Sequence, residues 1–175
     1  TLEVVDLPAV AQIARENGAL MVVDNAMATP VFSTALQAGA DLVVYSTTKH
    51  IDGQGRCLGG VILGARDLIR GPVETYMKHT GGAMNPFVAW MALKGLETLD
   101  LRVRAQAQAA WDIAAALEGH GALARVSYPM LQSHPQHAVA RAQYESGGTV
   151  LAIDLAGGKE AAFKVLNALE IFLIS

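Results

Sequence analysis

Two short polar segments carry the residue types in this sequence that are best suited to chemistry. Asp24 and Asn25 follow one apolar run, and Ser46, Thr48 and Lys49 follow the next. In an open α/β sheet, ligands bind beyond the carboxyl ends of the strands. If the two runs are neighbouring strands, a carboxylate and an amine face one crevice. A lysine in a partly apolar crevice loses charge stabilisation and can form an imine with an aldehyde.

These groups together match the needs of one cofactor. The hydroxyls of Ser46 and Thr48 could hold a phosphate, helped by free loop amides. The carboxylate of Asp24 would pair with a pyridinium nitrogen and keep it protonated, so that the ring can act as an electron sink. With Lys49 as the imine-forming amine, the set indicates pyridoxal phosphate. Spacing alone also allows Asp24 to be an ordinary turn or cap residue, because such segments are common in loops.

A helix and a strand must place the first segment. Asp6 can cap a helix that has Pro8 in its first turn and ends at Gly18, where a positive φ is needed. Residues 19–23 form a continuous apolar run, which predicts a strand buried on both faces. Asp24 stands directly at the end of this predicted strand.

The same pattern then places the second segment. A short helix is predicted at 32–38, closed by Gly39, and a second strand at 41–46. A turn at 52–55 separates it from a third apolar run at 58–64. Strands that alternate with short helices predict an α/β layer with a largely parallel sheet.

The second half of the chain has a different pattern. Residues from about 86 to 118 have apolar side chains at helical spacing, interrupted at 99–101, where we expect a bend or a domain junction. The tail predicts strands at 125–128, 149–155 and 170–174 and a helix at 158–169. This half therefore has the character of a second, α+β unit.

Composition excludes several classes of protein. The 175 residues correspond to one domain or part of a larger one, and 52% hydrophobic residues exclude intrinsic disorder. A net charge of −3 argues against a nucleic-acid partner. No apolar run approaches the ~18 residues of a membrane span, and the single Cys57 cannot form an internal disulfide. The first residues lack a start Met and a signal-peptide pattern, so we expect a piece cut from a longer chain.

Several longer segments strengthen the cofactor hypothesis when they are taken in order. They are Val-Val-Asp-Asn at 22–25, Thr-Pro at 29–30, Gly-Ala-Asp at 39–41, Ser-Thr-Thr-Lys at 46–49, Gly-Gly at 81–82, Asn-Pro-Phe at 85–87, Leu-Lys-Gly-Leu-Glu-Thr-Leu at 93–99, Tyr-Pro at 128–129 and His-Pro at 134–135. In this order they resemble the Cys/Met-metabolism family of pyridoxal-phosphate enzymes. That family includes cystathionine γ-synthase, cystathionine γ-lyase, methionine γ-lyase and the homoserine sulfhydrylases, and the resemblance covers essentially the whole chain.

One segment discriminates within that family. Residues 49–60, Lys-His-Ile-Asp-Gly-Gln-Gly-Arg-Cys-Leu-Gly-Gly, are similar to the O-succinylhomoserine sulfhydrylases. Lyases and synthases usually carry a motif closer to Lys-Tyr-Ile-Asn-Gly-His-Ser-Asp. His50 departs from the common Tyr, and Ala26 stands at a position that often has a hydroxyl residue.

The resemblance implies a role for each candidate residue. Lys49 would be the Schiff-base lysine and the catalytic residue, and Asp24 would be the partner of the pyridine nitrogen. Ser46 and Thr48 would contact the phosphate. No metal ion is implied.

The resemblance also implies a fold-type-I transferase fold, with a mostly parallel sheet between helices. Residues 1–98 would be the C-terminal part of the large, cofactor-binding domain, and 99–175 the start of a smaller α+β domain, connected by the helix at about 86–118. The glycine-containing phosphate loop, the ring-stacking Tyr, and a neighbouring subunit's Tyr and Arg would lie upstream. The Arg that binds the substrate carboxylate would lie downstream, so we expect the isolated 175 residues to be inactive.

The function implied is sulfhydrylation of O-succinylhomoserine by sulfide, which gives homocysteine for methionine biosynthesis. We expect a cytoplasmic homo-oligomer, a dimer of dimers, that acts on a small amino-acid substrate. Cystathionine γ-synthase and γ-lyase chemistry remain alternatives because they use the same cofactor residues. A non-catalytic α/β interaction domain is an alternative of another class, and a nicotinamide dehydrogenase lacks its glycine fingerprint here.

The remaining chemical side chains have simpler interpretations. Cys57 is expected to be a small buried hydrophobe. His134 and His137 make a weak metal site because they lack a third ligand. Arg56 could bind a substrate carboxylate such as a succinyl group, or it could be a solvated loop charge. The Gly-Gln-Gly turn at 53–55 is too short and wrongly placed for a dinucleotide fingerprint.

Overall fold

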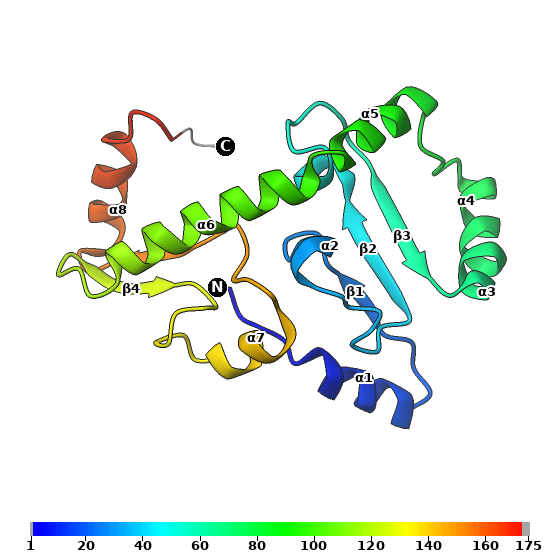
Figure 1. Cartoon of the computed structure of the whole chain (residues 1–175), viewed down its shortest axis with the longest axis horizontal. Coiled ribbons are helices and arrows are strands. Elements are labelled where there is room, and N and C mark those ends of the chain that lie inside the picture. Colours follow the sequence, from blue (N-terminus) through cyan, green and yellow to red (C-terminus); the bar gives the residue numbers. More distant parts are fainter. Residues whose placement is uncertain (1, 173–175) are drawn as a thin grey trace.

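Helix α6 (Leu99–Leu117) crosses the computed structural model and joins its two groups of strands (Figure 1). The structure describes residues 2–172. On one side lies a three-stranded sheet of order β1-β2-β3, and on the other β4 (Leu123–Ser127) pairs antiparallel with β5 (Ala152–Leu155). This mixed arrangement of helices and strands confirms the predicted α/β fold class.

The three-stranded sheet combines both kinds of pairing. Strand β1 (Val22–Asp24) runs parallel to β2 (Leu42–Ser46), which pairs antiparallel with β3 (Gly60–Gly64). The amide of Thr47 donates to the carbonyl of Gly59 at 2.9 Å, so the chain leaves β2 and returns at the same edge. This closed loop explains why the third strand of a predicted largely parallel sheet is antiparallel.

The elements before β2 match the sequence in part. Helix α1 (Leu7–Glu16) has the predicted cap, because Asp6 Oδ1 accepts the amide of Ala9 at 3.0 Å, and Gly18 has a φ of 61°. The prediction that 19–23 is a strand buried on both faces is wrong. The strand begins only at Val22, which is 57% exposed, and β1 forms an edge of the described sheet.

The helix predicted at 32–38 is also wrong in its bounds. Helix α2 (Thr29–Phe32) comes earlier, because Pro30 in its first turn favours a helix start and Ser33 is already extended. The residues from there to Gly39 form turns, and Gly39 has the predicted positive φ, 105°. The chain therefore reverses through a loop before β2.

The region after β3 contains helices that the patterns did not predict. They are α3 (Arg66–Leu68), the π-helical η2 (Ile69–Val73) and α4 (Glu74–Thr80). The long stretch at 86–118 is divided into α5 (Pro86–Leu96) and α6, so the interruption exists but lies at Glu97 and Thr98. Asn85 caps α5 by accepting the amide of Phe87 at 2.9 Å.

The C-terminal part largely follows its predicted elements. The strand expected at 125–128 is β4, the strand at 149–155 is the shorter β5, and the helix at 158–169 is α8 (Gly158–Asn167). Helix α7 (His137–Gln143) was not predicted. Of the strand predicted at 170–174, residues 170–172 form no strand, and the rest lies outside the described residues.

One face of α6 holds the two halves together. Its buried residues recur at intervals of four, four, three and four: Leu99, Val103, Ala107, Ala110 and Ala114. The first three pack with Phe32 of α2, and the last two with the cluster around Val126 and Tyr128. Among residues 2–172, no helix is both long enough and apolar enough to cross a membrane.

The N-terminal segment is tied to α7 by amide side chains. Gln143 Oε1 accepts the amide of Leu7 at 3.1 Å, while its Nε2 donates to the carbonyl of Val5 at 2.6 Å. Gln136 accepts the amide of Val4 at 3.1 Å. Residues more than 130 positions apart in the sequence therefore lie side by side.

Gly95 allows α5 to pack closely against η1. Element η1 (Thr47–Ile51) is a turn of π-helix that follows β2. A Cβ at this position would collide with the carbonyl oxygen of Ile51 and lie 3.0 Å from Asp52 Cα. Both are backbone atoms, which cannot rotate away. Gly95→Ala should therefore destabilise the protein by about 1–3 kcal/mol.

Thermal unfolding of the full-length protein measures this effect. The matched control is Gly71→Ala in η2, where an added Cβ would meet no atom within 4 Å. A lower midpoint for the Gly95 variant than for the Gly71 variant is the expected result. Equal midpoints for the two variants would contradict it.

Candidate active site

The two predicted site segments lie at one edge of the sheet. Asp24 is the last residue of β1, and its backbone pairs in register with Val44 of β2. Strand β2 continues to Ser46 and leads directly into η1, which carries Lys49. Because the strands are parallel, their carboxyl ends meet at the same edge, as sequence reasoning anticipated.

The backbone around Lys49 is an irregular turn. Lys49 has φ −83° and ψ −121°, which interrupts the helical geometry of η1. The amide of Asp52 donates to the carbonyl of Thr47 at 2.9 Å, and the amide of Gly53 donates to the carbonyl of Lys49 at 2.8 Å. The side chain of Lys49 is exposed. Its backbone is thus fixed by hydrogen bonds on both sides of the turn, while its side chain is exposed.

The two hydroxyl residues flank this turn in different ways. Ser46 is half-buried and pairs through its backbone with Gly60. Thr48 Oγ1 accepts the amide of Gly59 at 3.2 Å, so its own hydroxyl hydrogen can still be donated. Between them, the buried Thr47 Oγ1 has no hydrogen-bond partner among the described residues.

Asp24 has one oxygen engaged in its own turn. Asp24 Oδ1 accepts the amide of Ala26 at 3.0 Å, and the side chain is exposed. It lines a cavity of about 440 Å³ between the N-terminal segment and residues 146–150, to which Lys49, Ser46 and Thr48 do not contribute. A larger cavity of about 760 Å³, beside α6 and α7, contains none of the four predicted residues.

Asn25 is a site residue to which sequence reasoning assigned no role. It is 3% exposed, and its Nδ2 donates to Tyr45 Oη at 2.9 Å and to the carbonyl of Ser33 at 3.1 Å. A weaker contact of 3.3 Å reaches the carbonyl of Thr29. These bonds tie the turn after Asp24 to β2. The sequence signal that could have identified Asn25 is its place as a polar residue just after an apolar strand.

The same turn contains a strained residue. Thr29 is fully buried and has a φ of 63°, a left-handed conformation that a β-branched residue rarely adopts. Such strain costs about 1–3 kcal/mol and persists only where surrounding contacts enforce it. The amide of Thr29 donates to the carbonyl of Asn25 at 2.9 Å, and the carbonyl of Thr29 accepts Asn25 Nδ2, so two bonds to Asn25 hold this backbone.

His50 links three parts of the chain. Its Nδ1 donates to the carbonyl of Ala26 at 3.2 Å, and its Nε2 lies 2.7 Å from Thr149 Oγ1. Burial lowers the pKa of His50, the bond to Ala26 opposes that shift, and the nearby positive charge of Arg102 adds to it. The imidazole is therefore neutral at pH 7, and Nε2 accepts the Thr149 hydroxyl.

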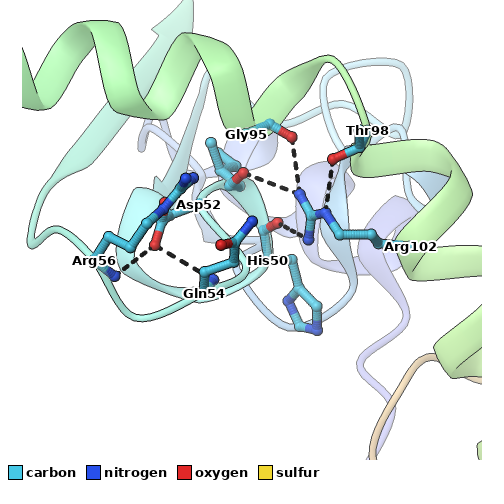
Figure 2. A network of polar contacts seen from close by, with 8 residues as sticks. His50, Asp52, Gln54, Arg56, Gly95, Thr98 and Arg102 are labelled. Carbon is cyan, nitrogen blue, oxygen red and sulfur yellow. Dashed lines mark hydrogen bonds and ion pairs between the residues drawn. The ribbon is translucent and has the colours of Figure 1, made fainter.

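Asp52 and Arg56 form an ion pair just beyond the lysine turn (Figure 2). Arg56 Nε donates to Asp52 Oδ1 at 2.8 Å, and its amide donates to Oδ2 at 2.7 Å. Burial of Asp52 would raise its pKa, but the bonds from Arg56 and from the Gln54 amide together lower it. Arg56 is thus held by a buried carboxylate, while its side chain remains 38% exposed, so both interpretations of this residue stay open.

The remaining candidates fall into structural roles. Cys57 is buried, in agreement with its expected behaviour as a small hydrophobe. His134 Nε2 donates to the carbonyl of Leu2 at 3.1 Å, which fixes the N-terminal segment. Within residues 2–172, no group of three or more His, Cys, Asp or Glu side chains gathers as a metal site would require.

The donors at this edge fit pyridoxal phosphate. A carboxylate stands at the end of β1, and an exposed amine stands beyond the end of β2. The hydroxyl of Thr48 keeps a hydrogen that a phosphate oxygen can accept. These are the group types that a pyridinium nitrogen, an aldehyde and a phosphate require.

Known proteins that resemble this chain belong to one enzyme family. All 175 residues match the model of the Cys/Met metabolism PLP-dependent enzymes. The chain is 49% identical to an O-succinylhomoserine sulfhydrylase of Mycobacterium tuberculosis, with 98% of the chain and 43% of that protein covered. It is 42% identical to the O-succinylhomoserine sulfhydrylase of Pseudomonas aeruginosa, with 99% and 43% covered.

A solved structure agrees with the fold. The cystathionine γ-synthase of Xanthomonas oryzae pv. oryzae superposes with a TM-score of 0.95 at 35% identity, and the match covers 99% of this chain and 45% of that one. The chain thus spans less than half the length of each of these three proteins.

Proposed function

The chain belongs to the Cys/Met metabolism PLP-dependent enzyme family, and from this we propose that the full-length protein is a pyridoxal-phosphate enzyme of sulfur amino-acid metabolism. The observation that supports the proposal is that Asp24 ends β1 while Lys49 lies in the segment directly after β2, at the same edge of this parallel pair of strands. We further propose that it replaces the γ-succinyl group of O-succinylhomoserine by sulfide. The two sulfhydrylase relatives support this proposal.

The residues of this chain have distinct tasks in the proposed reaction. When bound, pyridoxal phosphate supplies the electron sink that stabilises a carbanion at the substrate Cα. Lys49 holds the cofactor through its amine, and as a free amine it takes the proton from Cα and returns one later. Asp24 keeps a proton on the ring nitrogen, and the hydroxyls of Ser46 and Thr48 donate to the phosphate.

The overall reaction breaks one bond at the substrate γ-carbon and forms another there. The Cγ–O bond breaks and the acyl group leaves as succinate, while hydrogen sulfide forms the new Cγ–S bond of homocysteine. Departure of the group from Cγ requires an electron pair on the neighbouring Cβ, so a proton must leave Cβ after the Cα proton has been removed, and both carbons regain a proton after sulfide has added. We assign the proton transfers at Cα to the Lys49 amine, whose position therefore controls the start of the reaction. Turnover also requires groups that bind the substrate carboxylate, which we place outside these 175 residues.

We propose the division of the chain at residue 98, with 1–98 in the cofactor-binding domain and 99–175 in the next. The break between α5 and α6 at Glu97 and Thr98 supports this boundary. A homo-oligomer is proposed as well, because the family's neighbouring subunits share active sites.

Reduction with borohydride tests the cofactor assignment directly. The full-length protein is loaded with pyridoxal phosphate and reduced, and the modified peptide is then mapped by mass spectrometry. We expect a pyridoxyl group on Lys49, with the isolated 175 residues run in parallel as a weakly labelled control. An unmodified Lys49 in folded full-length protein would reject the enzyme assignment and favour an α/β interaction domain.

A second candidate is cystathionine γ-synthase chemistry, supported by the solved relative with a TM-score of 0.95. The two activities differ in the nucleophile, sulfide or cysteine, but not in the residues at this edge. Product analysis of O-succinylhomoserine with each nucleophile separates them. Homocysteine as the preferred product supports the sulfhydrylase, cystathionine supports the synthase, and release of an oxo acid without either nucleophile supports a lyase.

A further inference from the structure

Arg102 in α6 donates hydrogen bonds to the turn that carries Lys49, although the two lie about 50 residues apart in the sequence (Figure 2). Its Nη1 donates to the carbonyl of His50 at 3.0 Å, and its Nη2 donates to the carbonyl of Ile51 at 3.2 Å. These are the two carbonyls that directly follow Lys49 in η1. The end of the turn is therefore satisfied by a charged side chain from another element.

The same guanidinium also holds the end of α5. Nη2 donates to the carbonyl of Gly95 at 2.8 Å, and Nε donates to Thr98 Oγ1 at 3.0 Å. Carbonyls at a helix C-terminus have no partner within the helix and need one from outside. Arg102 thus joins the ends of η1 and α5 to Thr98, the N-cap residue of α6, through one planar group.

Two glycines leave room for this arrangement. A Cβ on Gly53 would overlap the guanidinium of Arg102, and Gly53 has a φ of 71° that favours glycine. A Cβ on Gly95 would collide with the carbonyl of Ile51, as described above. The close approach of α5, α6 and η1 therefore requires glycine at both positions. The guanidinium of Arg102 has little free space around it as a result.

We propose that Arg102 is a positioning residue, which acts through the main-chain carbonyls of His50 and Ile51 to fix the turn that presents Lys49. This inference rests on the proposed function, because it concerns the lysine assigned there to proton transfer. The geometry requires Arg rather than Lys, since the four acceptors are reached from three different nitrogens of the planar guanidinium, whereas an ammonium has only three donors on a single nitrogen.

Loss of this support should act on catalysis through geometry. A misplacement of about 1 Å at a reacting group can cost about a hundredfold in rate. We therefore expect Arg102→Lys to lower kcat about tenfold to a hundredfold with little change in KM. Arg102→Met, which removes the donors altogether, should have at least as large an effect.

The decisive measurement does not depend on turnover. Hydrogen–deuterium exchange of the cofactor-free, full-length protein reports on the amides of Asp52 and Gly53, which close the lysine turn. In both Arg102 variants we expect peptides covering 47–53 to exchange at least about tenfold faster, because local opening becomes easier. In the loaded protein, the pH midpoint of the cofactor's visible absorbance should also move.

Arg104→Met is the matched control, two residues further along α6. Arg104 pairs with Asp100 and Glu145 and lies over the ring of Phe32, away from η1. This variant should leave exchange at 47–53, the absorbance midpoint and kcat unchanged. Arg102→Lys keeps the charge and the helix propensity, so it serves if the Met variant fails to fold.

Each outcome decides the proposal. Faster exchange confined to 47–53, with thermal stability no lower than that of Arg104→Met, supports it. Unchanged exchange at 47–53 overturns it, even if activity falls. If the wild-type protein takes no pyridoxyl label at Lys49, the proposed function fails, while the exchange comparison still decides whether Arg102 holds the turn.

Discussion

Replacement of Lys49 by alanine should lower kcat of the full-length protein by about a thousandfold or more. The exposed amine is the group that we assign both to holding the cofactor and to moving the proton at the substrate Cα. No other lysine lies within η1 to take its place. Steady-state rates with O-succinylhomoserine and sulfide measure the effect, and borohydride labelling measures the loss of the covalent link.

The control for this prediction is Lys164→Ala. Lys164 is an exposed lysine in α8, which lies near the C-terminal end of α6, at the far end from strands β1 to β3 (Figure 1). It should retain full activity and full labelling. A Lys49 variant that turns over at a rate within about tenfold of the wild-type rate would contradict the proposed mechanism, because general acid–base groups contribute more than that.

Asp24→Asn should lower kcat by about a hundredfold to a thousandfold, the usual effect of removing one preorganised electrostatic group. The substitution removes the negative charge that is to hold a proton on the ring nitrogen. It retains an oxygen that can accept the amide of Ala26, so the turn after β1 is preserved. Steady-state kinetics and cofactor affinity are the measurements.

This substitution separates the two interpretations that spacing alone left open. If Asp24 is only a turn residue, asparagine serves as well, and kcat stays within about threefold of the wild-type value. If it is the cofactor's partner, the charge is essential. Asp67→Asn, an exposed carboxylate in α3, controls for the loss of one negative charge and should have no effect.

Local patterns predicted the elements whose stability is local. The cap at Asp6, the positive φ at Gly18 and strand β2 all depend on residues that are close in sequence. The helix at 32–38 failed because Ser33 is extended and ends α2, so that Phe32 packs against α6 while Ala35 packs in the cluster beside the sheet. Strand β1 was predicted too long because an apolar run does not show where pairing begins.

The candidate site divides in the same way. Asp24 and Lys49 could be found because each follows an apolar run, and the parallel pairing of those runs puts them at one edge. The supports of the site could not be found by pattern. Arg102 binds carbonyls 51 and 52 positions away, and His50 reaches Thr149 across 99 positions. Such contacts have no local period, so they emerge only from the fold.

The hydrogen bonds between the N-terminal segment and α7 set an order for folding during synthesis. Leu7 and Gln143 are separated by 136 residues, so the ribosome must add all of them before this bond can form. At the usual rate of translation this delay is on the order of ten seconds. The segment before α1 therefore remains without these hydrogen bonds during most of synthesis, and it docks against α7 only after the sheet and α6 have left the ribosome. Contacts of such high sequence separation slow the final step of folding, because a long loop must close before they form.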